Sequence, residues 1–179
     1  MSVATLKRLV PPPKRPVEVG NAKGFAAVEA RLGVKLPREY REFVLAYGSG
    51  LFAGFYRVYN PFAESPYLNL ASSIQRICAM NREIQLSDLN HKRFPLPYFP
   101  PAGGLLPWGN DENGNDYYWL TSGPSSRWCV VQQENRGTGI KVHPYSMVEF
   151  LIAILQKKVK ALASGYPRRE CFKFEPFSD

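Results

Sequence analysis

The sequence contains few of the residue types that usually carry out chemistry in proteins. Its 179 residues include two histidines and three cysteines. Neither His91 nor His143 lies in a metal-binding spacing such as HExxH, and Cys78, Cys129 and Cys171 are far apart, with no CxxC pair. We therefore expect no disulfide framework, no metal site and no other cofactor, and we interpret Cys78 and Cys129 as small buried hydrophobic residues.

Long apolar runs are absent as well. No stretch reaches the about 18 consecutive apolar residues that a membrane-spanning helix needs. The first twenty residues lack the apolar core of a signal peptide, so we expect a cytoplasmic protein with no membrane partner. Hydrophobic residues make up 45% of the chain and charged residues 21%, which is the balance of a globular domain rather than of a disordered one.

The charge is one-sided only at the two ends of the chain. The formal net charge is +8. Residues 1–23 carry five basic side chains against one acidic, and residues 157–179 carry six against three. The 133 residues between them carry twelve basic and eleven acidic groups, so the body is nearly neutral. Nucleic-acid binding needs a basic surface, so we do not expect the body of the protein to have a nucleic-acid partner.

The ends also differ from the body in composition. The segment Pro11–Pro16 contains four prolines and favours an extended arm that lies on the domain surface. We therefore divide the chain into a proline-rich basic arm over 1–20, one α+β domain over 21–163, and a basic tail over 164–179. Regular structure is expected to begin near Asn21.

Helical spacing of apolar residues predicts four helices in the body. One ends at Gly33, and a second begins at Pro37 and ends at Gly48. A third is capped by Asn69. The last begins at Ser146 with Glu149 three residues on, which is a capping box, and its apolar stripe continues to Leu162.

Strand-like patterns occupy the rest of the body. Residues 54–60 alternate, with Arg57 and Tyr59 on one face. After a proline-rich surface loop over 94–101, three apolar runs over 105–109, 115–121 and 127–133 are separated by turn residues and predict an antiparallel meander. We expect a mixed α+β single domain with a central, mostly antiparallel twisted sheet packed by about four helices.

No enzyme motif stands up to inspection. The stretch Asp111–Asp116 lacks the spacing of an EF-hand loop, because its glycine is the fourth residue and its twelfth position is Ser122. A polar hairpin turn with Gly114 at positive φ is the better interpretation. The glycines Gly48 and Gly50 follow a helix rather than a strand and are not a phosphate loop.

Two ordered motifs resemble a known family. The first runs LGVKLPREYREF from Leu32 and continues to YGSG at Tyr47; the second runs LPWGNDENG from Leu106. Followed by the YYWL strand and the closing SMVEFL helix, they resemble the SUKH superfamily, the Smi/Knr type, over roughly residues 21–160.

This resemblance implies a binding module without catalytic residues. Bacterial members of the superfamily are mostly thought to be immunity proteins that neutralise a cognate toxin, so a protein toxin domain is the expected partner and no small-molecule substrate is expected. Aromatic and arginine side chains usually dominate such interfaces. We predict the contact residues to be Arg57, Tyr59, Asn60 and Phe62 on the strand and its exit, with Asp111, Glu112 and Asp116 in the acidic turn.

Some of these residues have a purely structural alternative. Phe62 is equally well explained as a core residue, and the carboxylates as groups that solvate a turn. Three other functions stay open: a regulatory or scaffold module that docks through the proline arm, a nucleic-acid-binding protein that uses the basic ends, and, last, an enzyme.

Overall fold

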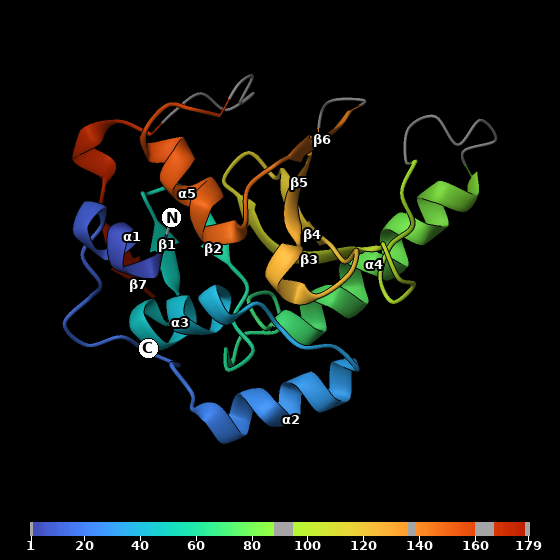
Figure 1. The fold of residues 1–179 in the computed structure, drawn as a ribbon, viewed down its shortest axis with the longest axis horizontal. Helices are drawn as coiled ribbons and strands as arrows, with labels where there is room; N and C mark the ends of the chain where they lie inside the picture. Colours follow the sequence, from blue (N-terminus) through green and yellow to red (C-terminus); the bar gives the residue numbers. More distant parts are fainter. Residues whose placement is uncertain (1, 88–94, 136–138, 160–166, 178–179) are drawn as a thin grey trace.

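The computed structural model of the chain describes residues 2–87, 95–135, 139–159 and 167–177 (Figure 1). The helices in this part of the chain are α1 (Val3–Leu9), α2 (Ala22–Leu32), α3 (Arg38–Tyr47), α4 (Leu70–Ser87) and α5 (Met147–Leu155), with 3-10 turns η1 (Ser125–Arg127) and η2 (Arg169–Cys171). The strands are β1 (Gly50–Phe52), β2 (Tyr56–Val58), β3 (Leu105–Asp111), β4 (Asp116–Leu120), β5 (Cys129–Gln133), β6 (Ile140–His143) and β7 (Phe174–Pro176).

The seven strands form one antiparallel sheet in the order β6-β5-β4-β3-β2-β1-β7. The predicted α+β class, the single domain and the antiparallel meander are confirmed, since β3, β4 and β5 lie where the apolar runs placed them. The strand predicted over 54–60 is shorter and is β2. The strands β1 and β6 were not predicted, because three or four residues are too few for an alternating pattern to be recognised.

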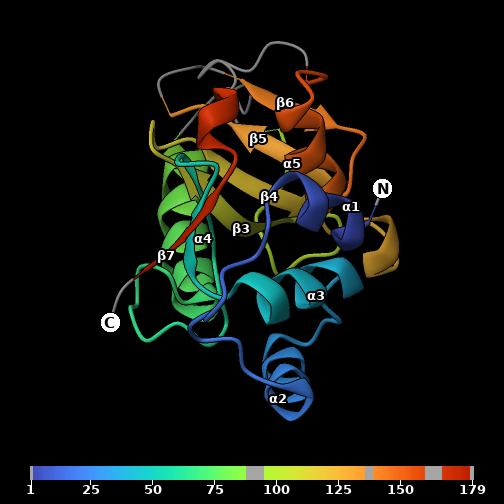
Figure 2. The same cartoon turned by 90° about the vertical axis from the view of Figure 1, so that its left-hand side faces the viewer.

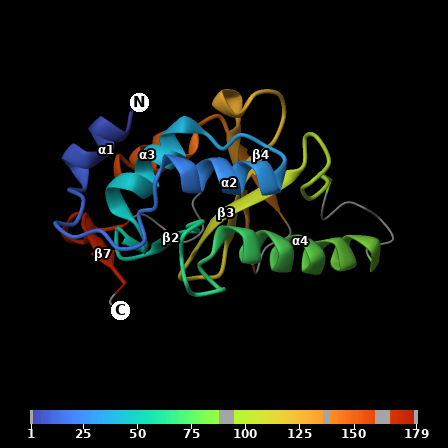
Figure 3. The ribbon, with the colours of Figure 1, turned by 90° about the horizontal axis from the view of Figure 1, so that it is seen from below.

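Helices cover the two faces of the sheet unequally. Figures 2 and 3 show α4 on one face and α1, α3 and α5 on the other. Neighbouring residues of β4 demonstrate this: the ring of Trp119 lies 5.0 Å from the ring of Tyr40 in α3, whereas the hydroxyl of Tyr118 lies 3.4 Å from Nδ2 of Asn81 in α4. We call these two sides the α3/α5 face and the α4 face.

The first helix corrects the expectation of an extended arm. Residues 3–9 form α1, which packs against α5 and α3 and buries Leu6 and Val10 completely. The hydroxyl of Tyr47 donates a 2.7 Å hydrogen bond to the carbonyl of Val10. The prolines of 11–16 do lie outside helices and strands, as predicted. Because these prolines favour an extended chain, the short helix before them was not indicated by the sequence. That helix is stabilised by apolar contacts that form only in the folded domain.

The last strand corrects the expectation of a separate basic tail. The strand β7 pairs with β1, placing Phe174 opposite Phe52 and Pro176 opposite Gly50. Phe174 is buried, and its ring centroid lies 5.2 Å from that of Tyr47. A strand of three residues has no recognisable period, and its partner β1 lies more than a hundred residues earlier, so the pairing cannot be derived from local sequence.

Two glycines end helices where the sequence predicted. Gly33 follows α2 with φ +71°, and Gly48 follows α3 with φ +67°. At Gly48 there is a second requirement, because a Cβ atom would lie 1.9 Å from the carbonyl oxygen of Val17. The same carbonyl accepts a 3.1 Å hydrogen bond from the backbone of Ser49. Gly48 therefore lets the segment after the prolines pass close to the end of α3.

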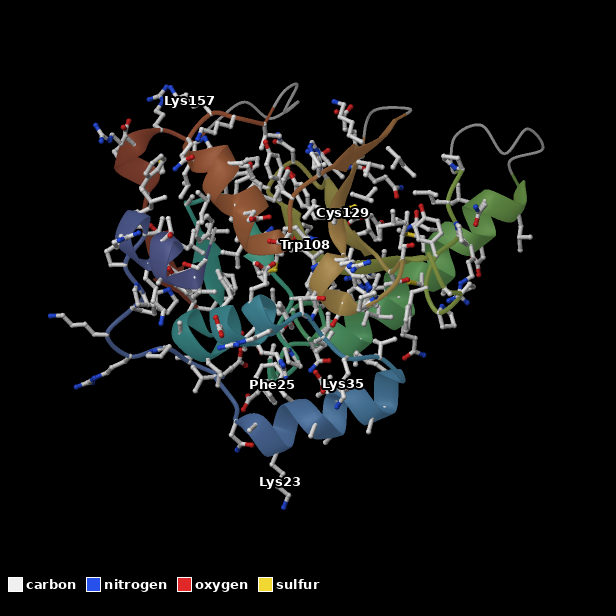
Figure 4. The ribbon with its side chains drawn as sticks, viewed as in Figure 1. Lys23, Phe25, Lys35, Trp108, Cys129 and Lys157 are labelled. Carbon is white, nitrogen blue, oxygen red and sulfur yellow. The ribbon has the colours of Figure 1, made fainter. Side chains whose placement is uncertain are left out.

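The helix α2 is held to the domain by one aromatic contact and one buried carboxylate. Figure 4 shows Phe25 directed toward the body of the protein and Lys23 directed away from it. The ring of Phe25 meets that of Phe62 edge to face at 4.9 Å. The carboxylate of Glu29 accepts hydrogen bonds from Lys35 (2.9 Å) and from the backbone of Leu36 (3.0 Å). These bonds fix the turn between α2 and α3.

The caps of α4 and α5 follow the predicted chemistry. Asn69 accepts hydrogen bonds from the second and third backbone N–H groups of α4, at 3.1 and 3.3 Å. Ser146 and Glu149 form the capping box of α5. The hydroxyl of Ser146 also donates a 2.7 Å hydrogen bond to the carboxylate of Glu39 in α3. Burial of Glu39 raises the pKa of this carboxylate. The helix α5 ends at Leu155. Leu162, which we expected in the same stripe, lies outside the described residues.

The loop before β3 enters the core instead of only crossing the surface. Tyr98 and Phe99 are buried, and the Tyr98 hydroxyl donates a 2.8 Å hydrogen bond to the side chain of Gln133 in β5. Residue 94, at the start of the predicted loop, lies outside the described residues. The prolines suggested that this loop would be exposed, but the aromatic residues between them are buried in the core.

Candidate functional site

A row of polar side chains crosses the sheet on its α4 face. Arg57 of β2 lies opposite Asn110 of β3, Asn110 opposite Asp116 of β4, and Asp116 opposite Gln133 of β5. Residues that pair directly across antiparallel strands project from the same face. Tyr118, two residues after Asp116, points the same way and reaches α4, so the whole row faces α4.

Asp116 is a half-buried carboxylate that receives little compensating hydrogen bonding. Within the described part of the chain it accepts one long hydrogen bond, 3.4 Å from the Tyr118 hydroxyl, and it forms no ion pair. Burial raises the pKa of Asp116 from 3.8 to about 6; the Tyr118 hydrogen bond and the charge of Arg76 lower it, and the charge of Asp111 raises it. The group is therefore ionised at neutral pH, although its surroundings disfavour the charge.

Two neighbouring polar atoms are buried without a partner. The hydroxyl of Tyr59 and Oδ1 of Asn110 accept or donate no hydrogen bond among the described residues. Burial raises the pKa of Tyr59, and the charge of Asp116 adds to this effect, whereas Arg76 and Arg57 oppose it. The phenol therefore lies within electrostatic reach of all three charges. Such orphaned groups are uncommon in folded proteins and call for an explanation.

The two arginines at this place are engaged elsewhere. Arg57 forms an ion pair with Glu112, in the turn after β3. Arg76 of α4 lies over the ring of Tyr67, with its guanidinium carbon 5.8 Å from the ring centroid. Both side chains border the polar row, and neither makes an ion pair with Asp116.

Asp111 has a structural role, although the sequence placed it with Asp116 in one acidic turn. Its side chain is 2% exposed and accepts hydrogen bonds from the backbones of Asn113 and Asn115, from the Asn115 amide and from the Tyr117 hydroxyl, at 2.8–3.0 Å. Tyr117 belongs to the α3/α5 face, since its ring packs 5.6 Å from that of Phe150. Asp111 thus holds the hairpin turn together from inside.

The turn itself has the predicted conformation. Gly114 has φ +78°, in the hairpin turn that joins the antiparallel strands β3 and β4. The described residues contain no group of three or more histidine, cysteine or acidic side chains arranged to hold a metal ion.

Asn60 and Phe62 have structural contacts as well. The Asn60 amide donates to the carbonyl of Glu18 and to the hydroxyl of Ser49, each at 2.9 Å, and its oxygen accepts from the backbone of Phe62. Phe62 packs on Phe25. These contacts favour the core interpretation for both residues. Of the seven predicted contact residues, Glu112 is exposed, Arg57, Phe62 and Asp116 are partly exposed, and Tyr59, Asn60 and Asp111 are buried.

Cys78, Cys129 and His143 lie in environments that do not activate them. Burial raises the pKa of the Cys78 thiol to about 11 and also raises that of Cys129. His143 is 7% exposed, burial lowers its pKa, and its ring lies 3.2 Å from the oxygen of Gln132. His91 lies outside the described residues.

Sequence analysis missed four members of the site: Asn110, Gln133, Arg76 and Tyr118. The register across three strand pairs brings the first two beside Asp116, and packing of α4 on the sheet brings Arg76 near. The alternation within the apolar runs was the available signal, because Asn110, Asp116 and Gln133 are the polar ends of strands that are otherwise apolar.

A seven-stranded antiparallel sheet with α4 on one face and α1, α3 and α5 on the other defines this chain as a single-domain α+β protein. Comparison with family models gives the particular family: the model described as SMI1-KNR4 cell-wall, of the SUKH type, matches residues 23–151. The chain therefore belongs to this family, and the predicted relationship to the SUKH superfamily is confirmed. A search of curated proteins found no match. Among the described residues, no helix combines the length and apolarity required to cross a membrane.

Proposed function

We propose that this chain is an immunity protein that binds a bacterial toxin domain in the cytoplasm and neutralises it, without catalysing a reaction. The observation that supports this function is membership of the SUKH type over residues 23–151. The side chains of the candidate site are consistent with it, because they are ionic and aromatic groups of the kind that anchor protein interfaces.

Exposure narrows the surface through which such a toxin would be bound. Arg57, Glu112 and Asp116 are the charged members of the predicted set that are at least partly exposed. Arg57 and Asp116 lie in the polar row of the α4 face, and Glu112 is paired with Arg57. If the toxin is a nuclease, its basic substrate groove would pair with Glu112 and Asp116 rather than with the basic ends of this chain.

The test is co-expression with a toxin domain encoded by a neighbouring gene, once the adjacent genes have been examined for one. We expect the chain to restore growth of cells that express the toxin, and the two purified proteins to elute together in gel filtration. The variant Lys23→Ala, whose side chain is directed away from the domain, serves as a control and should protect equally well. Continued toxicity together with separate elution would contradict the proposal.

A scaffold function through the proline segment is the second candidate, and one observation favours it. Pro11, Lys14 and Arg15 are exposed and lie outside helices and strands, so they are accessible to an aromatic groove of a partner. Deleting residues 1–20 would not test this, because it removes α1 from the core. The triple variant Pro11→Ala/Lys14→Ala/Arg15→Ala leaves α1 intact; unchanged partner binding by this variant would contradict a docking role.

A further inference from the structure

The two ends of the chain, which carry most of its positive charge, lie side by side in the folded domain. Tyr47, the last residue of α3, contacts both of them. Its hydroxyl donates a 2.7 Å hydrogen bond to the carbonyl of Val10, and its ring centroid lies 5.2 Å from that of Phe174. One residue of the domain thus joins the segment that follows α1 to the strand β7.

The backbone of Ser49 joins the same two segments. Its N–H donates a 3.1 Å hydrogen bond to the carbonyl of Val17, and its carbonyl accepts a 3.2 Å hydrogen bond from the N–H of Phe177. In Figure 2, α1, η2 and β7 lie on the side of the molecule that faces the viewer, together with α5, against which α1 packs. Figure 4 shows Lys157, two residues after α5, at this same end of the molecule.

The segments that meet there carry nine described basic side chains, all of them exposed. They are Lys7 and Arg8 of α1, Lys14 and Arg15 of the proline segment, Lys157 and Lys158 after α5, Arg168 and Arg169 at η2, and Lys173 beside β7. The described acidic side chains of the same segments are Glu18, Glu170 and Glu175, and the one ion pair that they form in this part of the structure joins Glu175 to Lys173. We call the nine basic side chains the basic surface.

The basic surface lacks the apolar groups on which other kinds of partner depend. The described large hydrophobic residues that are exposed are Leu45, Tyr67, Met80, Ile84, Leu86 and Val142, and none of them belongs to α1, η2, β7 or the segment 157–159. Stable protein interfaces have an apolar centre, and a helix that binds a membrane surface needs a free apolar face. The apolar residues Val3, Leu6 and Val10 of the first helix and its end are buried in the domain instead.

We propose that the basic surface, assembled from both ends of the chain, binds the phosphate backbone of nucleic acid without reading its base sequence. Such backbones carry closely spaced negative charges, and the protein surfaces that bind them are polar and strongly positive. Several separate segments supply basic side chains, so several phosphates can be contacted at once. This activity is independent of toxin binding, since Glu112 and Asp116 belong to the β3–β4 hairpin and not to the segments that form the basic surface.

Fluorescence anisotropy with labelled duplexes of about two helical turns tests the proposal. DNA and RNA duplexes of the same sequence are compared, and the tighter complex identifies which of the two polymers is the ligand. We expect a Kd of about 10⁻⁵ M at physiological salt, and a loss of affinity of about a hundredfold between about 50 and 200 mM KCl, as expected when about four phosphates are neutralised. A second duplex of unrelated sequence should bind within about twofold of the first.

Two outcomes of this titration would overturn the proposal. One is that neither duplex binds at the lowest salt concentration. The other is that the chain sediments with vesicles containing phosphatidylserine but binds neither duplex, which would assign the basic surface to a membrane. Both outcomes leave the proposed immunity function unaffected, because that function is tested by rescue from the toxin.

Paired neutralisations test whether the two ends act as one surface. Lys7→Gln/Arg8→Gln removes two charges from the N-terminal end, and Arg168→Gln/Arg169→Gln removes two from the C-terminal end. Each variant should raise the Kd about threefold to tenfold and lower the slope of the salt dependence by about two. A loss confined to one of the two variants would overturn the assembly of the surface from both ends.

A matched control separates the basic surface from net charge. Lys23→Gln/Arg31→Gln removes the same number of exposed charges from α2, where Lys23 is directed away from the domain. This variant should bind the duplex within about twofold of the unaltered chain. A loss as large as that of the paired variants would overturn the proposal, because the binding would then follow the net charge of the protein and not the place of the charges.

Discussion

The two faces of the sheet treat the same kind of side chain in opposite ways. Asp111 and Asp116 flank one hairpin turn, five residues apart. On the α3/α5 face, Asp111 receives four hydrogen bonds of 2.8–3.0 Å. On the α4 face, Asp116 receives one of 3.4 Å, and burial raises its pKa to about 6. A buried carboxylate that accepts several short hydrogen bonds stabilises the fold. One that is buried with few hydrogen bonds lowers stability, which points to a role outside folding.

Removing the compensated carboxylate should have the largest effect. Asp111→Ala leaves the Tyr117 hydroxyl and the Asn115 amide buried without their acceptor, so we expect the free energy of unfolding to fall by about 3–4 kcal/mol. Urea denaturation followed by tryptophan fluorescence measures this. If Asp111→Ala lowered the free energy of unfolding no more than Glu112→Ala, a substitution of an exposed turn residue, Asp111 would not differ from Asp116 as described.

Removing apolar packing from the α3/α5 face should have the next largest effect. Leu6 of α1 is fully buried, and Leu6→Ala should lower the free energy of unfolding by about 3 kcal/mol through lost burial and the cavity that remains. Exposed Lys7 in the same helix is the matched position, and Lys7→Ala should change stability little. Equal effects of the two substitutions would mean that α1 does not belong to the core.

Neutralising the uncompensated carboxylate should have the opposite sign. Because the folded state raises the pKa of Asp116 above its value of 3.8, the folded protein binds a proton more tightly, and stability falls as pH rises from about 4 to about 6. Asp116→Asn removes this loss. We expect it to raise the free energy of unfolding by about 1–2 kcal/mol at pH 7.5 and to match the unaltered chain near pH 4.

Thermal unfolding at the two pH values measures the difference between these proteins. A decrease of Tm at pH 7.5 on substitution to Asn would contradict the assignment of Asp116 as a destabilising group. It would place Asp116 in the same category as Asp111.

The rim of the row should matter least for folding. Arg57 and Glu112 form a partly exposed ion pair, so Arg57→Ala should change the free energy of unfolding by less than about 0.5 kcal/mol. Chemical denaturation at low and at high salt checks this, since the small effect should disappear in high salt. A loss above 1 kcal/mol would mean that Arg57 also supports the buried centre of the row.

Local chemistry made much of the fold predictable. Helix ends at Gly33 and Gly48, the cap at Asn69 and the capping box at Ser146 each depend on a few neighbouring residues, and all four were found. The three longer strands of the meander also have enough residues for their pattern to be seen.

What escaped prediction depends on contacts between distant segments. The helix α1 is stabilised by α3 and α5, and β7 is stabilised by β1, so neither has a strong local signal. The acidic turn was predicted as one surface because sequence proximity does not reveal which face of the sheet each carboxylate takes. The polar row likewise depends on strand register, which brings Asn110 beside Asp116.

The pairing of β7 with β1 has a consequence for synthesis of the protein. Gly50–Phe52 leaves the ribosome long before Phe174–Pro176, so the edge of β1 has no neighbour on that side while the rest of the chain is translated. An open strand edge is a template for pairing with another chain. The sheet is therefore complete only after residues near 176 have been synthesised. A truncated transcript that lacks these residues, or a protease that removes them, would give a protein whose open β1 edge favours aggregation.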